Sequence, residues 1–183
     1  MLCEKAMLQN SKEAALVFKT AKEKQIFVME AMWSRFLPAV KKVKSWIEEG
    51  SIGIPEIAQF SIGFVAPEGK ENRYFNPKLG GGAAKDITVY AYELTTYILN
   101  QRIKNITASA TWSDTGVDIN DHISIDFEYT LADLTASFVT KMEDKMVIYG
   151  RKGKIESSIV PWKDTASCAE LFDKIEETRV VSC

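Results

Sequence analysis

The stretch His122-Ile123-Ser124-Ile125-Asp126-Phe127-Glu128-Tyr129 alternates polar and apolar side chains. This two-residue period is typical of a strand that buries one of its faces. Strand character continues through most of the chain after residue 100, in segments at residues 103–112, 122–129, 134–140, 146–149 and 154–160. A run of consecutive strands predicts a largely antiparallel sheet.

Helices are expected before this run of strands. Apolar residues recur with helical spacing in three segments, at residues 11–24, 38–49 and 83–99. Ser11 is the expected N-cap of the first helix, and Pro38 begins the second. A short buried strand at residues 25–31 and another strand at residues 57–65 lie between the helices. Helices first and strands later predict an α+β fold, a largely antiparallel sheet with helices packed on one face.

The composition argues against several classes of protein. The chain has 183 residues, of which 46% are hydrophobic, and this suits one domain of ordinary size. A net charge of −2 provides no basic field for nucleic acid or an anionic membrane, and no apolar run is long enough to span a bilayer. The N-terminal residues do not resemble a signal peptide, so we expect a cytoplasmic protein. We expect no metal site, and we expect free thiols at Cys3, Cys168 and Cys183.

The loop Leu79-Gly80-Gly81-Gly82-Ala83 leads into the third helix. Free N–H groups at a helix start favour an anion or a polar ligand, but three glycines also permit a tight passage of the chain. Asp86 and Tyr90 follow four residues apart, and therefore on one helix face. An acceptor and a phenol there can form an acid–base pair if a cation such as Lys5 or Arg73 stabilises the phenolate. The alternative is that Asp86 lies on the surface and Tyr90 only packs between helix and sheet.

Residues near the N-terminus form a second group of candidates. Glu4 and Lys5 follow the end of a short strand, where α/β sheets position ligand-binding groups. A lysine this close to a terminus is, alternatively, a solvated charge. Trp33 and Arg35 lie in an aromatic and basic junction between strand and helix, which packing alone can explain. The acidic segment at residues 118–121 is predicted to be a turn, and it precedes a structural histidine.

Together these segments resemble one family, the NAD(P)-dependent oxidoreductases of the glucose-fructose oxidoreductase/inositol dehydrogenase (Gfo/Idh/MocA) type, particularly its dihydrodiol dehydrogenase-like branch. Cys3-Glu4-Lys5-Ala6 is similar to the Glu-Lys-Pro motif at the end of a Rossmann strand, and residues 27–38 are similar to the segment leaving the dinucleotide domain. The loop and helix that carry the family's acid–base residues are similar to Arg73-Tyr74-Phe75-Asn76-Pro77, Gly80-Gly81-Gly82-Ala83 and Asp86-Ile87-Thr88-Val89-Tyr90. The resemblance covers nearly the whole chain.

The resemblance implies a role for each candidate residue. Lys5 would position the substrate hydroxyl and lower its pKa, Tyr90 would shuttle the proton, and Asp86 would orient the site. Hydride would pass between nicotinamide and a sugar-like or diol substrate. The open sheet face would pair with a second copy of the chain in a homodimer, and residues 169–182 would be strand. The residues implied to bind the cofactor are Glu4, Lys5, Trp33 and Arg35, and those implied to bind the substrate are Arg73, Tyr74 and Gly82.

The sequence departs from the family pattern at three positions: Ala6 replaces a proline, Lys85 replaces an apolar residue and Thr88 replaces a glycine. The Gly-x-Gly-x-x-Gly fingerprint of the dinucleotide domain does not occur. We therefore expect residues 1–35 to be the remnant of a Rossmann domain. Residues 36–183 would be an α/β substrate-binding and dimerisation domain without its last elements. Such an N-terminally truncated chain would derive from a parent that uses NAD or NADP, would bind the cofactor weakly or not at all, and would be inactive alone.

Two alternative functions remain open. The chain could be a non-catalytic α+β module that dimerises through its sheet, which the missing fingerprint and the departures at Lys85 and Thr88 favour. It could also be a sugar-binding or anion-binding domain that uses the helix start at residues 80–82. The sequence identifies neither the substrate nor the choice between NAD and NADP.

Overall fold

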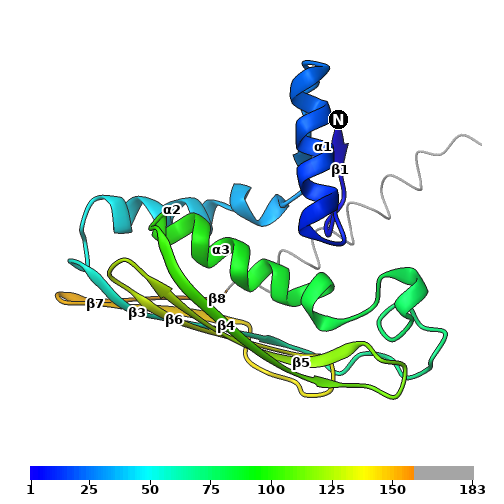
Figure 1. The fold of residues 1–183 in the computed structure, drawn as a ribbon. Helices are drawn as coiled ribbons and strands as arrows, with labels where there is room; N and C mark the ends of the chain where they lie inside the picture. The colour runs from blue at the N-terminus through cyan, green and yellow to red at the C-terminus, as the bar shows by residue number, and fades with distance from the viewer. Residues whose placement is uncertain (159–183) are drawn as a thin grey trace, which may run out of the picture.

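The computed structural model describes residues 1–158, and its centre is a six-stranded sheet with the strand order β4-β5-β6-β3-β7-β8 (Figure 1). Neighbouring strands are antiparallel except for β3 and β6, which are parallel. The predicted, largely antiparallel sheet is therefore confirmed. The strands are β3 (Pro55–Gly63), β4 (Ile103–Trp112), β5 (Asp118–Phe127), β6 (Leu131–Ser137), β7 (Lys145–Gly150) and β8 (Gly153–Ser158).

Helices α2 (Pro38–Glu48) and α3 (Val89–Leu99) lie along one face of this sheet (Figure 1). A π-helical turn, η3 (Ala84–Thr88), leads directly into α3, so the predicted helix at residues 83–99 is one continuous segment with two geometries. The opposite face of the sheet is open among the described residues. This arrangement confirms the α+β fold with helices on one face. None of the described helices has the length and apolar character needed to cross a membrane.

The core fills the space between α3 and the sheet. Leu94 and Ile98 of α3 are fully buried against inward-facing strand residues such as Ile125 and Leu134. Alternation places every second side chain of a strand on the same face, which explains the apolar period from which the sheet was predicted. The apolar residues that recur with helical spacing in residues 83–99 are all buried: Ile87, Ala91, Leu94 and Ile98.

Strand β5 differs from its prediction at both ends. It begins at Asp118 rather than at residue 122, and the predicted turn at residues 118–121 is part of the strand. Pairing with strands on both sides overrides the turn tendency of these residues, since Asp121 is paired with Ala110 of β4 and Ala136 of β6. Tyr129 lies beyond the strand end and is 60% exposed.

The N-terminal segment lies beyond α2 and α3, away from the sheet (Figure 1). Its strands β1 (Leu2–Cys3) and β2 (Met29–Glu30) pair in parallel, and helix α1 (Ser11–Glu23) connects them. A short 3-10 helix, η1 (Trp33–Phe36), then leads to α2.

Two predictions for this segment are wrong. The N-cap of α1 is Asn10, whose side chain accepts the N–H of Glu13, rather than Ser11. The predicted buried strand at residues 25–31 contracts to β2, and Ile26 and Phe27 are exposed because no described element packs against them. Predictions for residues 159–183, including the segment 169–182, Cys168 and Cys183, lie outside the described residues. Cys3 is a free thiol.

Candidate active site

Lys5 joins the N-terminal segment to the helix layer. It follows β1 at the carboxyl edge of the β1–β2 pair, and its Nζ donates to Asp86 Oδ1 at 2.5 Å and to the Asp86 carbonyl oxygen at 2.6 Å. Only 15% of the Lys5 side chain and 17% of the Asp86 side chain are exposed. Lys5 is therefore a partner in a largely buried ion pair and not a solvated terminal charge.

Arg73 provides a second cation for the same carboxylate. Its Nη1 donates to Asp86 Oδ1 at 3.2 Å, and its guanidinium lies over the ring of Tyr74, with Cζ 4.1 Å from the ring centroid. Burial alone would lower the pKa of Arg73, but the hydrogen bond to Asp86 and the negative charge of Asp86 raise this pKa above its ordinary value. Asp86 therefore anchors cations from two distant segments of the chain.

Tyr90 lies one helical turn after Asp86, on the side that faces the N-terminal segment. Lys5 Nζ is 5.1 Å from the centroid of its ring. Trp33 Nε1 donates to the Tyr90 hydroxyl oxygen at 3.0 Å, and the two rings meet edge to face with centroids 6.1 Å apart. Because the hydroxyl oxygen accepts from the indole, the phenol proton remains free to be donated to another acceptor.

The glycine-rich loop before η3 permits a tight passage of the chain. The N–H groups of residues 80–82 all donate to backbone carbonyls of the preceding loop, and the Ala84 N–H donates to Asp118 Oδ2 at 2.5 Å. A Cβ atom at Gly81 would lie 2.8 Å from the carbonyl oxygen of Tyr74. Asp118 thus provides the negative charge that a helix start attracts. The N–H groups of residues 80–82 are therefore not available to an anion.

Asp121 is a buried carboxylate that the sequence analysis missed. Thr88 Oγ1 donates to its Oδ2 at 2.5 Å beneath the start of α3. Burial raises the pKa of Asp121 to about 6, the charge of Asp118 also raises it, and the hydrogen bond from Thr88 lowers it. The acidic residues of this segment suggested a turn. The signal that could have identified Asp121 is Thr88, because a hydroxyl at a position where the family has glycine needs a polar partner beneath the helix.

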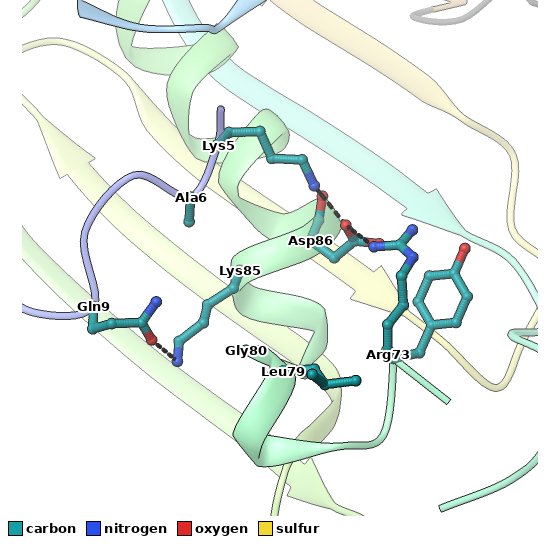
Figure 2. Close-up of a pocket in the computed structure, with 11 residues that line it drawn as sticks. Lys5, Ala6, Gln9, Arg73, Leu79, Gly80, Lys85 and Asp86 are labelled. Atoms are coloured by element: carbon teal, nitrogen blue, oxygen red, sulfur yellow. Dashed lines mark hydrogen bonds and ion pairs between the residues drawn. The ribbon is translucent and has the colours of Figure 1, made fainter. Parts of the chain in front are cut away.

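A pocket of about 180 Å³ opens beside the Lys5–Asp86 pair. Residues near Lys5, the loop from Arg73 to Gly82 and the first turn of η3 line it (Figure 2). Lys85 Nζ donates to Gln9 Oε1 at 2.5 Å at this pocket, a contact that sequence spacing did not indicate.

The structure brings most of the predicted site residues together. Lys5, Arg73, Tyr74, Gly82 and Asp86 line the pocket. Tyr90 adjoins it through Lys5, and Trp33 contacts Tyr90. Two predicted cofactor-binding residues are not part of this group. Arg35 forms an ion pair with Glu93 and lies over the ring of Tyr97 at 5.1 Å, and Glu4 is exposed with no hydrogen bond or ion pair to the described residues. Among residues 1–158, no cluster of His, Cys, Asp or Glu could hold a metal ion.

The chain as a whole is similar to known proteins. The family model described as the GFO/IDH/MocA C-terminal domain matches residues 40–156. Trans-1,2-dihydrobenzene-1,2-diol dehydrogenase of Xenopus laevis is 30% identical over 170 residues, which cover 91% of this chain and 50% of that protein. D-xylose 1-dehydrogenase (NADP(+)) of Hypocrea jecorina is 32% identical over 179 residues, which cover 85% of this chain and 46% of that protein.

A similar fold occurs in a solved structure, the aldose-aldose oxidoreductase from Caulobacter crescentus complexed with glycerol. It superposes with a TM-score of 0.78 at 19% identity, covering 85% of this chain and 48% of that one. The chain spans about half the length of the curated relatives it matches. Because the family model matches more than half of its residues, the chain belongs to the GFO/IDH/MocA family through the family's C-terminal domain.

Proposed function

We propose that this chain forms the substrate side of the active site of a nicotinamide-dependent dehydrogenase, which interconverts an alcohol and a carbonyl on a sugar-like or diol substrate. The observation that carries the proposal is the ion pair between Lys5 and Asp86, with Tyr90 one turn away. The similarity to a diol dehydrogenase and a xylose dehydrogenase supports this class of reaction.

The site residues can stabilise an alkoxide and move a proton. An ammonium group such as that of Lys5, placed against a substrate hydroxyl, favours the ionised form and lowers the hydroxyl pKa. Asp86 orients this ammonium by accepting two hydrogen bonds from it, one at the Asp86 carboxylate and one at the Asp86 carbonyl oxygen. Tyr90 supplies the phenol that exchanges a proton with the substrate oxygen, and Trp33 fixes the orientation of the phenol.

The residues fit the nicotinamide end of a dinucleotide cofactor. The carboxyl ends of the parallel strands β1 and β2 lie side by side, and α/β proteins bind ligands at such an edge. Trp33 follows β2 and presents an indole that is 49% exposed. Nicotinamide would supply the hydride acceptor or donor, held at this edge by Lys5 and Trp33. The sequence has no Gly-x-Gly-x-x-Gly segment for the cofactor phosphates, so we expect the 183-residue chain to bind NADPH or NADH weakly or not at all.

The proposal is tested by placing the dinucleotide half of the Xenopus laevis relative before Met1. This fusion is assayed with NAD⁺ and NADP⁺ against trans-dihydrodiols and D-xylose by the absorbance of the reduced cofactor. We expect turnover, and a loss in kcat of about 10²–10⁴-fold in the Lys5→Met and Tyr90→Phe variants, which remove the ammonium that stabilises the alkoxide and the phenol that moves the proton. The matched control is Lys12→Met, on the exposed surface of α1, which should retain the rate.

Two outcomes would contradict the proposal. One is a folded fusion that binds NADP⁺ but oxidises none of these alcohols. The other is an active fusion in which Lys5→Met turns over as fast as Lys12→Met. For the 183-residue chain alone, tight and stoichiometric NADPH binding by calorimetry would contradict the expectation that it binds the cofactor weakly.

We also propose that the open face of the sheet pairs with a second copy of the chain. Tyr149, Ile57 and Leu131 lie in one row across β7, β3 and β6, with exposures of 39%, 37% and 53%. An exposed apolar row on an otherwise polar face is typical of a self-association surface. Sedimentation should show a dimer that the Leu131→Lys variant dissociates. A monomer at micromolar concentration would rule out this pairing.

A further inference from the structure

The charges that line the pocket do not balance. Three cations, from Lys5, Arg73 and Lys85, face a single carboxylate, that of Asp86. Lys5 and Arg73 both bind this carboxylate, whereas Lys85 forms no ion pair with any described residue. The excess positive charge of the pocket therefore lies with Lys85.

Lys85 is held in place by a neutral partner. Its Nζ donates to Gln9 Oε1 at 2.5 Å, and the Lys85 side chain is partly buried at the pocket wall. In Figure 2, Lys85 and Gln9 point toward one another on the opposite side of the pocket from Arg73. The ammonium retains two further N–H donors, and the Gln9 amide nitrogen adds two more. These donors are the kind that bind a carboxylate or a phosphate.

The backbone N–H groups of the glycine loop are already bound within the protein. The N–H groups of residues 80–82 and of Ala84 all have protein acceptors, with Asp118 supplying the negative charge at the helix start. An anion in this pocket would therefore be recognised by side chains, and Lys85 is the cation without a carboxylate partner among the described residues.

We propose that Lys85, positioned by Gln9, selects substrates that carry an anionic group, a carboxylate or a phosphate, at the end remote from the reacting carbon. This inference rests on the proposed function, since it requires that the alcohol react near Lys5 and Tyr90. The substrate class is then a sugar acid or a sugar phosphate. A neutral polyol would leave the Lys85 charge without a counter-charge in a partly enclosed pocket, where an ion pair is stronger than in bulk water.

The test is a calorimetric titration of the 183-residue chain with three related molecules: D-gluconate, the phosphate monoester of D-glucitol, and neutral D-glucitol. They share a chain of hydroxyl groups and differ in the end group, so the two anions distinguish carboxylate from phosphate recognition. We expect at least one anion to bind about 10-fold more tightly than D-glucitol, because one hydrogen bond to a charged group is worth about that factor. Raising the salt concentration should reduce this preference.

Two variants of Lys85 and one matched control complete the test. Lys85→Met removes the charge, and Lys85→Gln removes it but keeps a donor for Gln9, so a folded variant is available even if one of them is unstable. Both should bind D-gluconate and D-glucitol equally. The control is Lys78→Met, which removes the same charge from an exposed position in the short 3-10 helix Pro77–Leu79 that does not line the pocket. It should retain the preference of the unmodified chain.

The inference is overturned if the unmodified chain binds neither anion more tightly than D-glucitol, or if Lys85→Gln keeps the preference. These results are separable from those of the dehydrogenase assay. A fusion that oxidises neutral diols and shows no preference for anions leaves the proposed function standing and removes the anion selectivity. If instead the chain prefers anions through Lys85 but the fusion transfers no hydride, the anion selectivity stands and the proposed function is removed.

Discussion

The N-terminal segment, residues 1–36, and the sheet with its helices, residues 38–158, bury their apolar side chains to very different extents. In the sheet region, Leu94, Leu134 and Phe138 have no exposed surface. In the N-terminal segment, α1 buries none of its residues, and Leu16 and Phe18 are 66% and 51% exposed. Hydrophobic burial is the main source of folding stability, so the core of the sheet region is sufficient to stabilise that region. The N-terminal segment depends on the contacts it makes with the rest of the protein, which include those between Lys5 and Asp86, Trp33 and Tyr90, and Arg35 and Glu93.

The Phe138→Ala variant is expected to have the largest effect on stability. The Phe138 ring contacts those of Phe64, Tyr74 and Phe75, with centroids 5.4, 5.3 and 6.3 Å away. Its removal leaves a cavity in a close-packed core, and we expect the free energy of unfolding to fall by about 3–5 kcal/mol. Chemical denaturation followed by circular dichroism measures this change.

The matched control is Phe18→Ala in α1, which removes an equal volume from an exposed position. We expect it to change the free energy of unfolding by about 0.5 kcal/mol or less. If both variants lose the same free energy of unfolding, the two regions contribute alike to stability and the N-terminal segment has a packed core of its own.

Asp121 is a weak point within the stable region. Its pKa is about 6 in the folded protein against 3.8 ordinarily, so the folded state binds more protons than the unfolded state between these values. Stability therefore falls as pH rises through this window, by up to about 3 kcal/mol, and the loss is complete above pH 6. Thermal unfolding of the Asp121→Asn variant at a series of pH values should lack this component.

A second variant tests the cause of the effect of Asp121. Thr88→Val removes the hydrogen bond that lowers the pKa of Asp121 while keeping the side-chain volume. The pH window in which stability is lost should then extend upward. If the pH profiles of the unmodified protein and Asp121→Asn are parallel, Asp121 is not the group responsible.

The Lys5→Met variant tests the contact between the two regions directly. It removes two hydrogen bonds to Asp86 but no core side chain, and Arg73 still neutralises the carboxylate, so we expect the free energy of unfolding to fall by about 1.5–3 kcal/mol. Hydrogen exchange should accelerate in α1 and β2 and remain unchanged in β5 and β6, because local opening no longer breaks this contact. Lys12→Met, on the exposed face of α1, is the control and should leave all rates unaltered. Uniform acceleration would instead indicate one cooperative unit.

The sequence predicted those elements whose apolar face is buried in the described structure. Ile125 and Phe127 are both buried, because the helix layer covers the face of the sheet to which they belong. The same reasoning failed for residues 25–31, because periodicity identifies a surface that can be buried and not whether a partner covers it. It also failed at Asp118, where pairing with strands on both sides outweighs the turn tendency of an acidic residue.

The candidate site was predictable only where it is local. Asp86 and Tyr90 share a helix face through four-residue spacing, and the sequence indicated this directly. The contacts between Lys5 and Asp86, 81 residues apart, and between Trp33 and Tyr90, 57 residues apart, depend on tertiary structure. The resemblance to a family suggested a shared site, but the hydrogen bond between Trp33 and Tyr90 followed from neither spacing nor composition.

The Trp33→Phe variant is expected to have the smallest effect. It distinguishes two roles for Trp33, contact with the cofactor and a hydrogen bond to Tyr90. Trp33→Phe in the fusion keeps an aromatic ring but removes the Nε1 donor to the Tyr90 oxygen. A lost hydrogen bond of about 0.5–1.5 kcal/mol should lower kcat about 2–10-fold and leave the KM for the cofactor unchanged. Trp46→Phe, at a partly exposed position on α2, is the control and should change neither. A raised KM for NADP⁺ at constant kcat would assign Trp33 to cofactor binding, because the Tyr90 contact acts on the proton and not on the cofactor.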